Sequence, residues 1–191
     1  MNYFPAHSIK KNGEMLYEKL EQFSNATSNC DEEVALHIEA HSLGALVTLA
    51  ALAVAIREDN EAVFDLIKIF ALLAPPLNGS PVAEDLSNLT LIEYLLAHFS
   101  SDDEPTPLLK DLAQNPSEII DNEEGSSIGI EEVFHKLSSK GVKLNIYLVS
   151  RDVMIKRSGV LSDLLNVKVI KEATHNELVK SPVVFNDLFP A

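Results

Sequence analysis

The segment that most constrains the fold lies at residues 34–56, where a strand pattern is followed directly by a helix pattern. In residues 34–40, apolar side chains occupy alternate positions, which is typical of a half-buried strand. Residues 43–56 are apolar on nearly every side and predict a deeply buried helix. Such a helix needs packing partners all round, so we expect it to lie inside a layered domain.

The same alternation of strand and helix continues along the chain. Strands that alternate with helices pair in parallel through right-handed crossovers. The sequence therefore predicts an α/β fold with a mainly parallel sheet flanked by helices. The predicted strands are residues 34–40, 65–74, 142–149 and 167–170, and the predicted helices are residues 12–23, 43–56, 130–139, 158–165 and 182–189.

The second and third predicted strands are separated by a long connection, residues 78–140, which prolines and glycines break into short pieces. Within it, apolar residues at helical spacing from Leu89 to Phe99 predict a helix. We therefore expect a helical insertion or cap over residues 78–140. A length of 191 residues with 46% hydrophobic content fits one domain over residues 1–191.

The charge balance excludes several classes of function. Lys and Arg number 15 and Asp and Glu number 29, so the net charge is −14, which disfavours binding to nucleic acids and anionic membranes. The chain has no apolar run near the ~20 residues that span a bilayer, and Met1–Lys11 does not resemble a signal peptide. We therefore expect a soluble, cytoplasmic protein.

The residues that usually hold metals or cofactors are sparse. Cys30 is the only cysteine, which excludes an intrachain disulfide and a cysteine-based zinc site. The histidines show no ligand spacing, and the seven glycines are too dispersed for a phosphate loop. The sequence therefore predicts neither a metal nor a cofactor.

The segment Ala40-His41-Ser42-Leu43-Gly44 joins the predicted strand and helix of residues 34–56. Its small residues permit a sharp turn that raises the Ser42 hydroxyl above the sheet, at the positive end of the helix. The backbone N–H of Leu43 would then point to the position of a developing oxyanion. The alternative is a plain strand-to-helix turn with Ser42 as the helix cap.

Two further candidates follow the third and fourth predicted strands, namely Asp152 and His175. The carboxyl ends of parallel strands meet at one edge of a sheet, where catalytic groups gather. From its loop, His175 could reach Ser42 and remove its proton. Asp163 competes poorly with Asp152 because it falls inside a helix pattern, whereas Glu172 competes slightly better.

The order Ser, Asp, His, each directly after a strand, resembles the α/β-hydrolase superfamily, and its lipase and esterase branches most. Residues 40–44 look like the nucleophile elbow, with Ala in place of the first Gly, and residues 73–81 resemble a lipase-like Pro-then-Gly-Ser-Pro stretch. The resemblance covers about residue 12 to the end. It implies hydrolysis of carboxylic esters, lipid esters included, through an acyl-enzyme. The implied roles are nucleophile for Ser42, proton shuttle for His175 and orienting acid for Asp152. The resemblance also implies a packing and orientation role for His41.

One part of the family pattern is not identifiable. Residues 1–33 contain one predicted helix, no clear strand and no His-Gly pair that could supply the second oxyanion N–H. We therefore expect the strand at 34–40 near an open sheet edge, where a second copy or another partner chain could pair. Three interpretations stay open: a fragment of a longer gene product, an assembly through that edge, or a weakly active hydrolase. Two other functions also stay open: a non-catalytic binding protein on this fold, and an acyltransferase that uses the same three residues.

Overall fold

A four-stranded parallel sheet forms the centre of the computed structural model and confirms the predicted sheet type. The strands lie in the order β1-β2-β5-β6, with β1 at Leu36–His41, β2 at Ile67–Leu73, β5 at Lys143–Val149 and β6 at Asn166–Ile170. The structure describes residues 7–28, 33–77, 121–123, 126–150, 165–171 and 173–190, together with Pro107 and Asp111.

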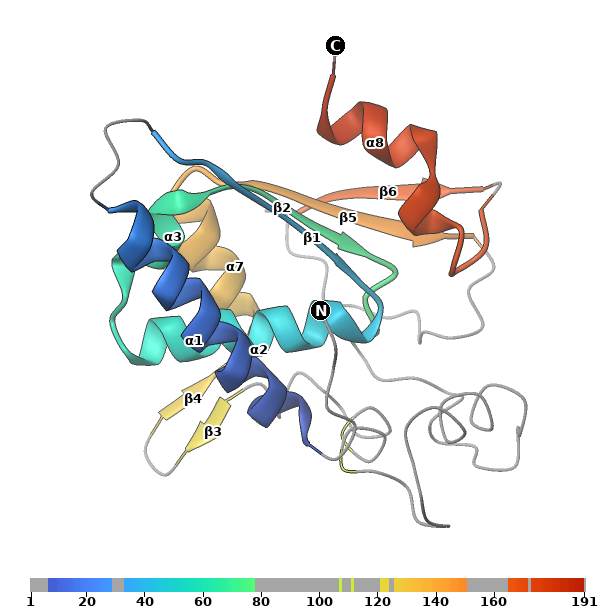
Figure 1. Ribbon diagram of the computed structural model, residues 1–191. Helices are drawn as coiled ribbons and strands as arrows, with labels where there is room; N and C mark the ends of the chain where they lie inside the picture. The colour runs from blue at the N-terminus through green and yellow to red at the C-terminus, as the bar shows by residue number, and fades with distance from the viewer. Residues whose placement is uncertain are drawn as a thin grey trace.

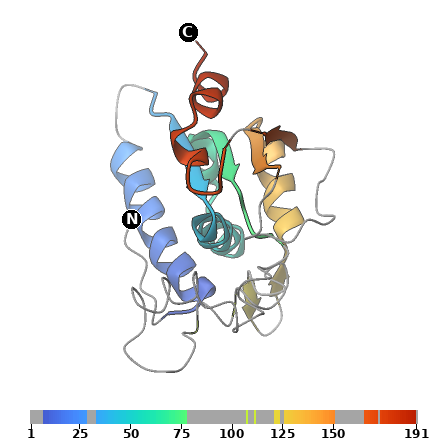
Figure 2. The same cartoon turned by 90° about the vertical axis from the view of Figure 1, so that its right-hand side faces the viewer.

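Helices cover both faces of this sheet. On one face lie α1 (Ile9–Thr27), α2 (Leu43–Arg57) and α7 (Ile130–Ser139), and on the other lies α8 (Pro182–Leu188) (Figure 1). Figure 2 shows the same arrangement from the side, with α8 on the face opposite α2. Two short elements complete the path: α3 (Glu61–Leu66) precedes β2, and the 3-10 helix η2 (Leu178–Lys180) precedes α8.

The described residues form two hydrophobic cores, and the larger lies between the sheet and the helices α1, α2 and α7. Every residue of α2 from Gly44 to Ala55 is buried, as its all-round apolar sequence predicts. The contact between α1 and α2 is very close at Gly13, where an added Cβ would stand 2.6 Å from the Cβ of Ala50. A side chain at position 13 would push the two helices apart.

The smaller core lies between the sheet and α8, and contains Leu73 and Tyr147 from the strands and Leu178, Val184 and Leu188 from the C-terminal elements. Polar contacts also hold α8 to the sheet. The carboxylate of Asp187 accepts a hydrogen bond from the Tyr147 hydroxyl and forms an ion pair with Lys168. Lys143 Nζ donates to the backbone oxygen of Asp187 over 3.2 Å. Because this core is small, polar contacts form a large part of the interactions that hold α8 on the sheet.

The predicted elements that fall on described residues agree with the structure except at some boundaries. The helix predicted at 12–23 extends to Ile9–Thr27, and the strand predicted at 65–74 begins only at Ile67 because Asp65 and Leu66 end α3. The helix predicted at 158–165 and most of the insertion expected over 78–140 lie outside the described residues. An antiparallel pair in that connection, β3 (Asp121–Glu123) with β4 (Ser126–Ile128), was not predicted.

The strand β1 forms one end of the described sheet, because β2 is its neighbour on one side and no described strand pairs on the other. This is the placement expected for residues 34–40, and pairing with a partner chain stays a prediction. None of the helices in the described part of the chain is long and apolar enough to cross a membrane.

Candidate active site

Ser42 occupies a sharp turn between the end of β1 at His41 and the start of α2 at Leu43. Its backbone angles are φ 52° and ψ −127°, which is the conformation of the first central residue in a type II′ turn, where glycine is usual. Two hydrogen bonds hold the turn: Ser42 N–H donates to the Leu73 oxygen (2.8 Å), and the Ser42 oxygen accepts from Ala45 N–H (2.9 Å). The sequence therefore places a serine where the backbone favours glycine.

His175 lies in a loop that is held by hydrogen bonds between its own residues. The backbone N–H and the hydroxyl of Thr174 both donate to the carboxylate of Glu177, over 3.0 and 2.8 Å. These two bonds lower the pKa of the Glu177 carboxyl, since they favour its charged form. In return, the backbone N–H groups of Glu177 and Leu178 donate to the Thr174 oxygen, and the Leu178 side chain is fully buried in the smaller core. The loop is thus anchored directly beyond His175.

The structure brings Ser42 and His175 together although they are 133 positions apart in the chain. His175 Nε2 lies 2.9 Å from Ser42 Oγ, a hydrogen-bond distance. When Ser42 Oγ–H is the donor, Nε2 is the acceptor and the neutral imidazole carries its hydrogen on Nδ1. Because β6 stands at the opposite end of the sheet from β1, the chain after Ile170 has to cross roughly 14 Å of sheet edge, three strand spacings, to make this contact.

Of the remaining predicted site residues, Asp152 lies outside the described residues, as do its competitors Asp163 and Glu172. The strand before Asp152, β5, ends at Val149 between β2 and β6, at the same sheet edge as Ser42. Leu43 is the first residue of α2, where the backbone N–H has no acceptor within the helix and the helix dipole is positive. Its role as an oxyanion donor stays a prediction.

Two residues of this site carried no assigned chemistry in the sequence. His41 Nε2 lies 2.9 Å from the backbone oxygen of His175, and the two imidazole rings are 4.8 Å apart between centroids. Glu177 forms the reciprocal contacts with Thr174 described above. The spacing Thr174-x-x-Glu177 is that of a capping box, so a search for this motif would have identified Glu177. His41 lies in no comparable motif, and the resemblance implied for it only a packing and orientation role.

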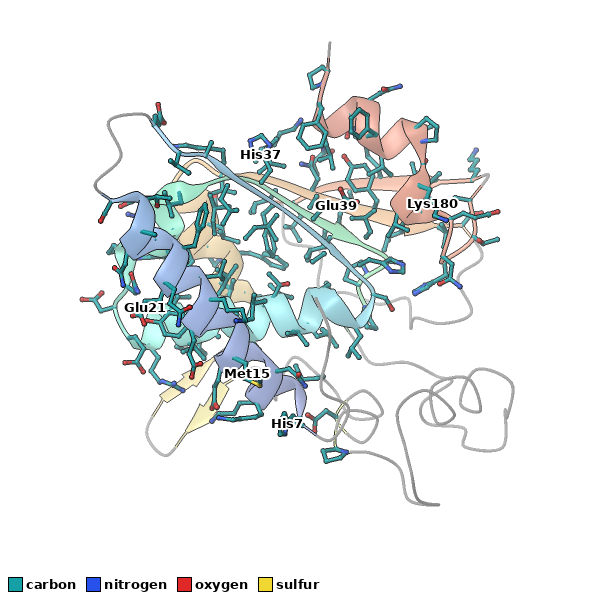
Figure 3. The ribbon with its side chains drawn as sticks, in the orientation of Figure 1. His7, Met15, Glu21, His37, Glu39 and Lys180 are labelled. Atoms are coloured by element: carbon teal, nitrogen blue, oxygen red, sulfur yellow. The ribbon has the colours of Figure 1, made fainter. Side chains whose placement is uncertain are left out.

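A groove of about 330 Å³ runs between Glu39 of β1 and the residues of η2 and α8, including Lys180 and Phe185. Burial raises the pKa of the Glu39 carboxyl. Figure 3 shows Glu39 and His37 on the side of the sheet that carries α8, and the His37 ring stacks on Phe189 with centroids 5.5 Å apart. Neither Ser42 nor His175 lines this groove, so we do not assign it to the reacting bond. Within the described part of the chain, no group of three or more His, Cys, Asp or Glu side chains could hold a metal ion.

Comparison with a solved structure identifies the fold. The chain superposes on the mature form of the lipase BlEst2 from Bacillus licheniformis with a TM-score of 0.61 and 12% identity, over 100% of this chain and 76% of the lipase. The chain has an α/β-hydrolase fold. This confirms the fold that the order of Ser42, Asp152 and His175 implied.

Two other solved structures match with lower scores. The propeptide form of the same lipase matches 80% of this chain and 28% of its own, at 13% identity and a TM-score of 0.45. A carboxylesterase structure from the thaumarchaeon Nitrososphaera gargenis matches 98% of this chain and 72% of its own, at 12% identity and a TM-score of 0.44. No protein-family model matches the chain, and no curated protein matches it by sequence.

Proposed function

We propose that the protein is a serine hydrolase that cleaves carboxylic esters, lipid esters among them, through an acyl-enzyme. The observation that carries the proposal is the 2.9 Å contact between Ser42 Oγ and His175 Nε2. It combines a hydroxyl on a turn that favours glycine with a base at hydrogen-bond distance. An ordinary helix cap requires neither feature, and the side chain of Ser42 forms no capping hydrogen bond with α2.

In the proposed reaction, Ser42 Oγ attacks the ester carbonyl carbon while its proton passes to His175 Nε2. The negative charge on the carbonyl oxygen is stabilised by the backbone N–H of Leu43 and the positive end of α2. His175 then protonates the leaving alcohol, and a water molecule repeats the sequence on the acyl-enzyme and releases the acid. Asp152 is assigned to accept a hydrogen bond from His175 Nδ1–H and to stabilise the imidazolium.

The experiment combines labelling by a fluorophosphonate probe with hydrolysis of p-nitrophenyl esters of increasing chain length. The wild-type protein should be labelled at Ser42 and should turn over at least one ester. Ser42→Ala should abolish labelling and lower kcat/KM by about 10⁴-fold or more, and Asp152→Asn should lower it by roughly the same factor.

Ser139→Ala is the matched control, because Ser139 is an exposed serine at the end of α7, before the amino end of β5. It should be labelled like the wild-type protein. The proposal fails if the folded wild-type protein takes up no probe, or if Ser42→Ala is labelled as fast as Ser139→Ala. Transfer of the acyl group to an added alcohol in preference to water would instead establish an acyltransferase.

A further inference from the structure

His41 connects the strand that carries the nucleophile to the loop that carries the base. It is the last residue of β1 and the immediate neighbour of Ser42. Its Nε2 atom lies 2.9 Å from the backbone oxygen of His175, while the side chain of His175 lies 2.9 Å from Ser42 Oγ. These contacts close a ring that runs from the Ser42 side chain through His175 and His41 back to the Ser42 backbone.

The chemistry of the first contact fixes its direction. A backbone carbonyl oxygen can only accept a hydrogen bond, so Nε2 of His41 carries a hydrogen and donates it. The bond therefore acts on the position of the His175 backbone and leaves the His175 imidazole available to Ser42. The ring of His41 also lies close to that imidazole, with 4.8 Å between the centroids and a tilt of 54°.

The other contacts of the loop act at a different place. The Thr174–Glu177 hydrogen bonds hold the turn within itself, and the buried Leu178 attaches it to the core beneath α8. Neither set of contacts fixes the position of the loop relative to Ser42. The His41 bond does, because His41 and Ser42 share a peptide bond.

We propose that His41 is a positioning residue, whose Nε2–H···O bond to the backbone of His175 sets the distance between the His175 imidazole and the Ser42 hydroxyl. The proposal rests on the proposed hydrolase function. Proton transfer depends steeply on this distance, and a displacement of about 1 Å can cost roughly 10²-fold in rate. Loss of the bond should therefore lower kcat while KM, which reflects substrate contacts elsewhere, changes little.

Two substitutions separate the hydrogen bond from the shape of the ring. His41→Phe keeps a planar ring but has no donor, and His41→Gln keeps an N–H donor at about the same reach. We expect His41→Phe to lower kcat for p-nitrophenyl ester hydrolysis by about 10- to 100-fold, with KM within about twofold. His41→Gln should restore most of the rate. Equal losses in the two variants, or an unchanged kcat in folded His41→Phe, would overturn the proposal.

A second measurement tests the bond without using activity. The backbone N–H groups of Glu177 and Leu178 are hydrogen-bonded in the native loop, so their hydrogen exchange reports its opening. Loss of one hydrogen bond should raise their exchange rates by about two- to tenfold in His41→Phe and much less in His41→Gln. If His41→Phe fails to fold, His41→Asn, whose amide is too short to reach the carbonyl, replaces it.

The two measurements distinguish failure of this proposal from failure of the proposed function. An inactive, unlabelled wild-type protein with loop exchange accelerated in His41→Phe would remove the hydrolase function and keep the structural bond. An active wild-type protein with unchanged exchange and unchanged kcat in His41→Phe would remove the role of His41 and keep the hydrolase.

Discussion

The two faces of the sheet hold the two halves of the candidate site by different means. On one face, Ser42 leads into α2, whose buried residues form the middle of the larger core. On the other, the loop of His175 depends on the smaller core through Leu178 and on the polar attachment of α8 through Asp187. The nucleophile is therefore supported by the bulk of the fold, while the base is supported by a part that can loosen separately.

Stability and proton transfer should therefore respond to different substitutions. A region with few buried apolar contacts can open at a lower free energy than the whole domain. Damage to the smaller core should thus separate His175 from Ser42 before the protein unfolds. Damage to the larger core should change how much protein is folded, and change the folded site little.

The largest expected effect is on stability, from Leu46→Ala in α2. Leu46 is fully buried in the larger core, and such a truncation costs about 2–5 kcal/mol. We expect a loss in the upper half of that range by urea unfolding, with the rate of fluorophosphonate labelling per folded molecule close to that of the wild-type protein. A loss below about 1 kcal/mol would contradict the central role of this core.

Leu178→Ala makes the same truncation in the smaller core, where Leu178 is also fully buried. We expect a loss of about 2 kcal/mol, at the lower end of the range for such truncations, because α8 and its loop can adjust locally. The labelling rate per folded molecule should fall by about tenfold or more, since His175 is no longer held at Ser42. If Leu46→Ala slows labelling more than Leu178→Ala does, the smaller core does not control the Ser42–His175 geometry more than the larger core does.

Asp187→Asn tests the polar attachment of α8 and should cost about 1 kcal/mol at neutral pH. The hydrogen bond from Lys168, followed by that from Tyr147, lowers the pKa of the Asp187 carboxyl from its usual 3.8. A lowered pKa means that the carboxylate stabilises the fold above pH 3.8, and that this contribution is lost as the pH falls through the lowered value. The difference in urea midpoint between the two proteins should therefore shrink between pH 7 and pH 3. A constant difference would show that the charge of Asp187 is irrelevant.

Glu177→Gln should have the smallest effect, a decrease of about two- to fivefold in labelling rate, because the amide oxygen still accepts a bond from Thr174. Hydrogen bonds from Thr174 lower the pKa of Glu177 from 4.5. The support that the Glu177 carboxylate gives the loop is thus present above pH 4.5 and lost as the pH falls through the lowered pKa. Glu177→Ala, which removes the acceptor, is the control and should be slower than Glu177→Gln.

The sequence predicts long elements better than short ones, for physical reasons. Residues 43–56 and 130–139 contain enough apolar positions to define a helix, and both helices are confirmed. The six residues of α3 are too short for a periodic signal, and the three-residue strand β3 is entirely polar.

The candidate site is predictable only in part. Ser42 and His175 could be identified because each follows a strand, and parallel strands end at one edge. The contact of His41 with the backbone of His175 could not. It depends on the strand order β1-β2-β5-β6, which sends the chain after β6 back across the sheet edge, and no local pattern encodes that order.

At position 42, the residue type that best stabilises the turn differs from the residue type that the proposed reaction needs. A residue other than glycine with a positive φ in such a turn costs about 1–3 kcal/mol, and glycine at position 42 would largely avoid this cost. A protein with Ser42→Gly is therefore expected to be more stable than the natural one and to lack the hydroxyl. Selection for thermal stability alone would favour glycine at position 42, so the Ser42 hydroxyl is present at the expense of a more stable turn.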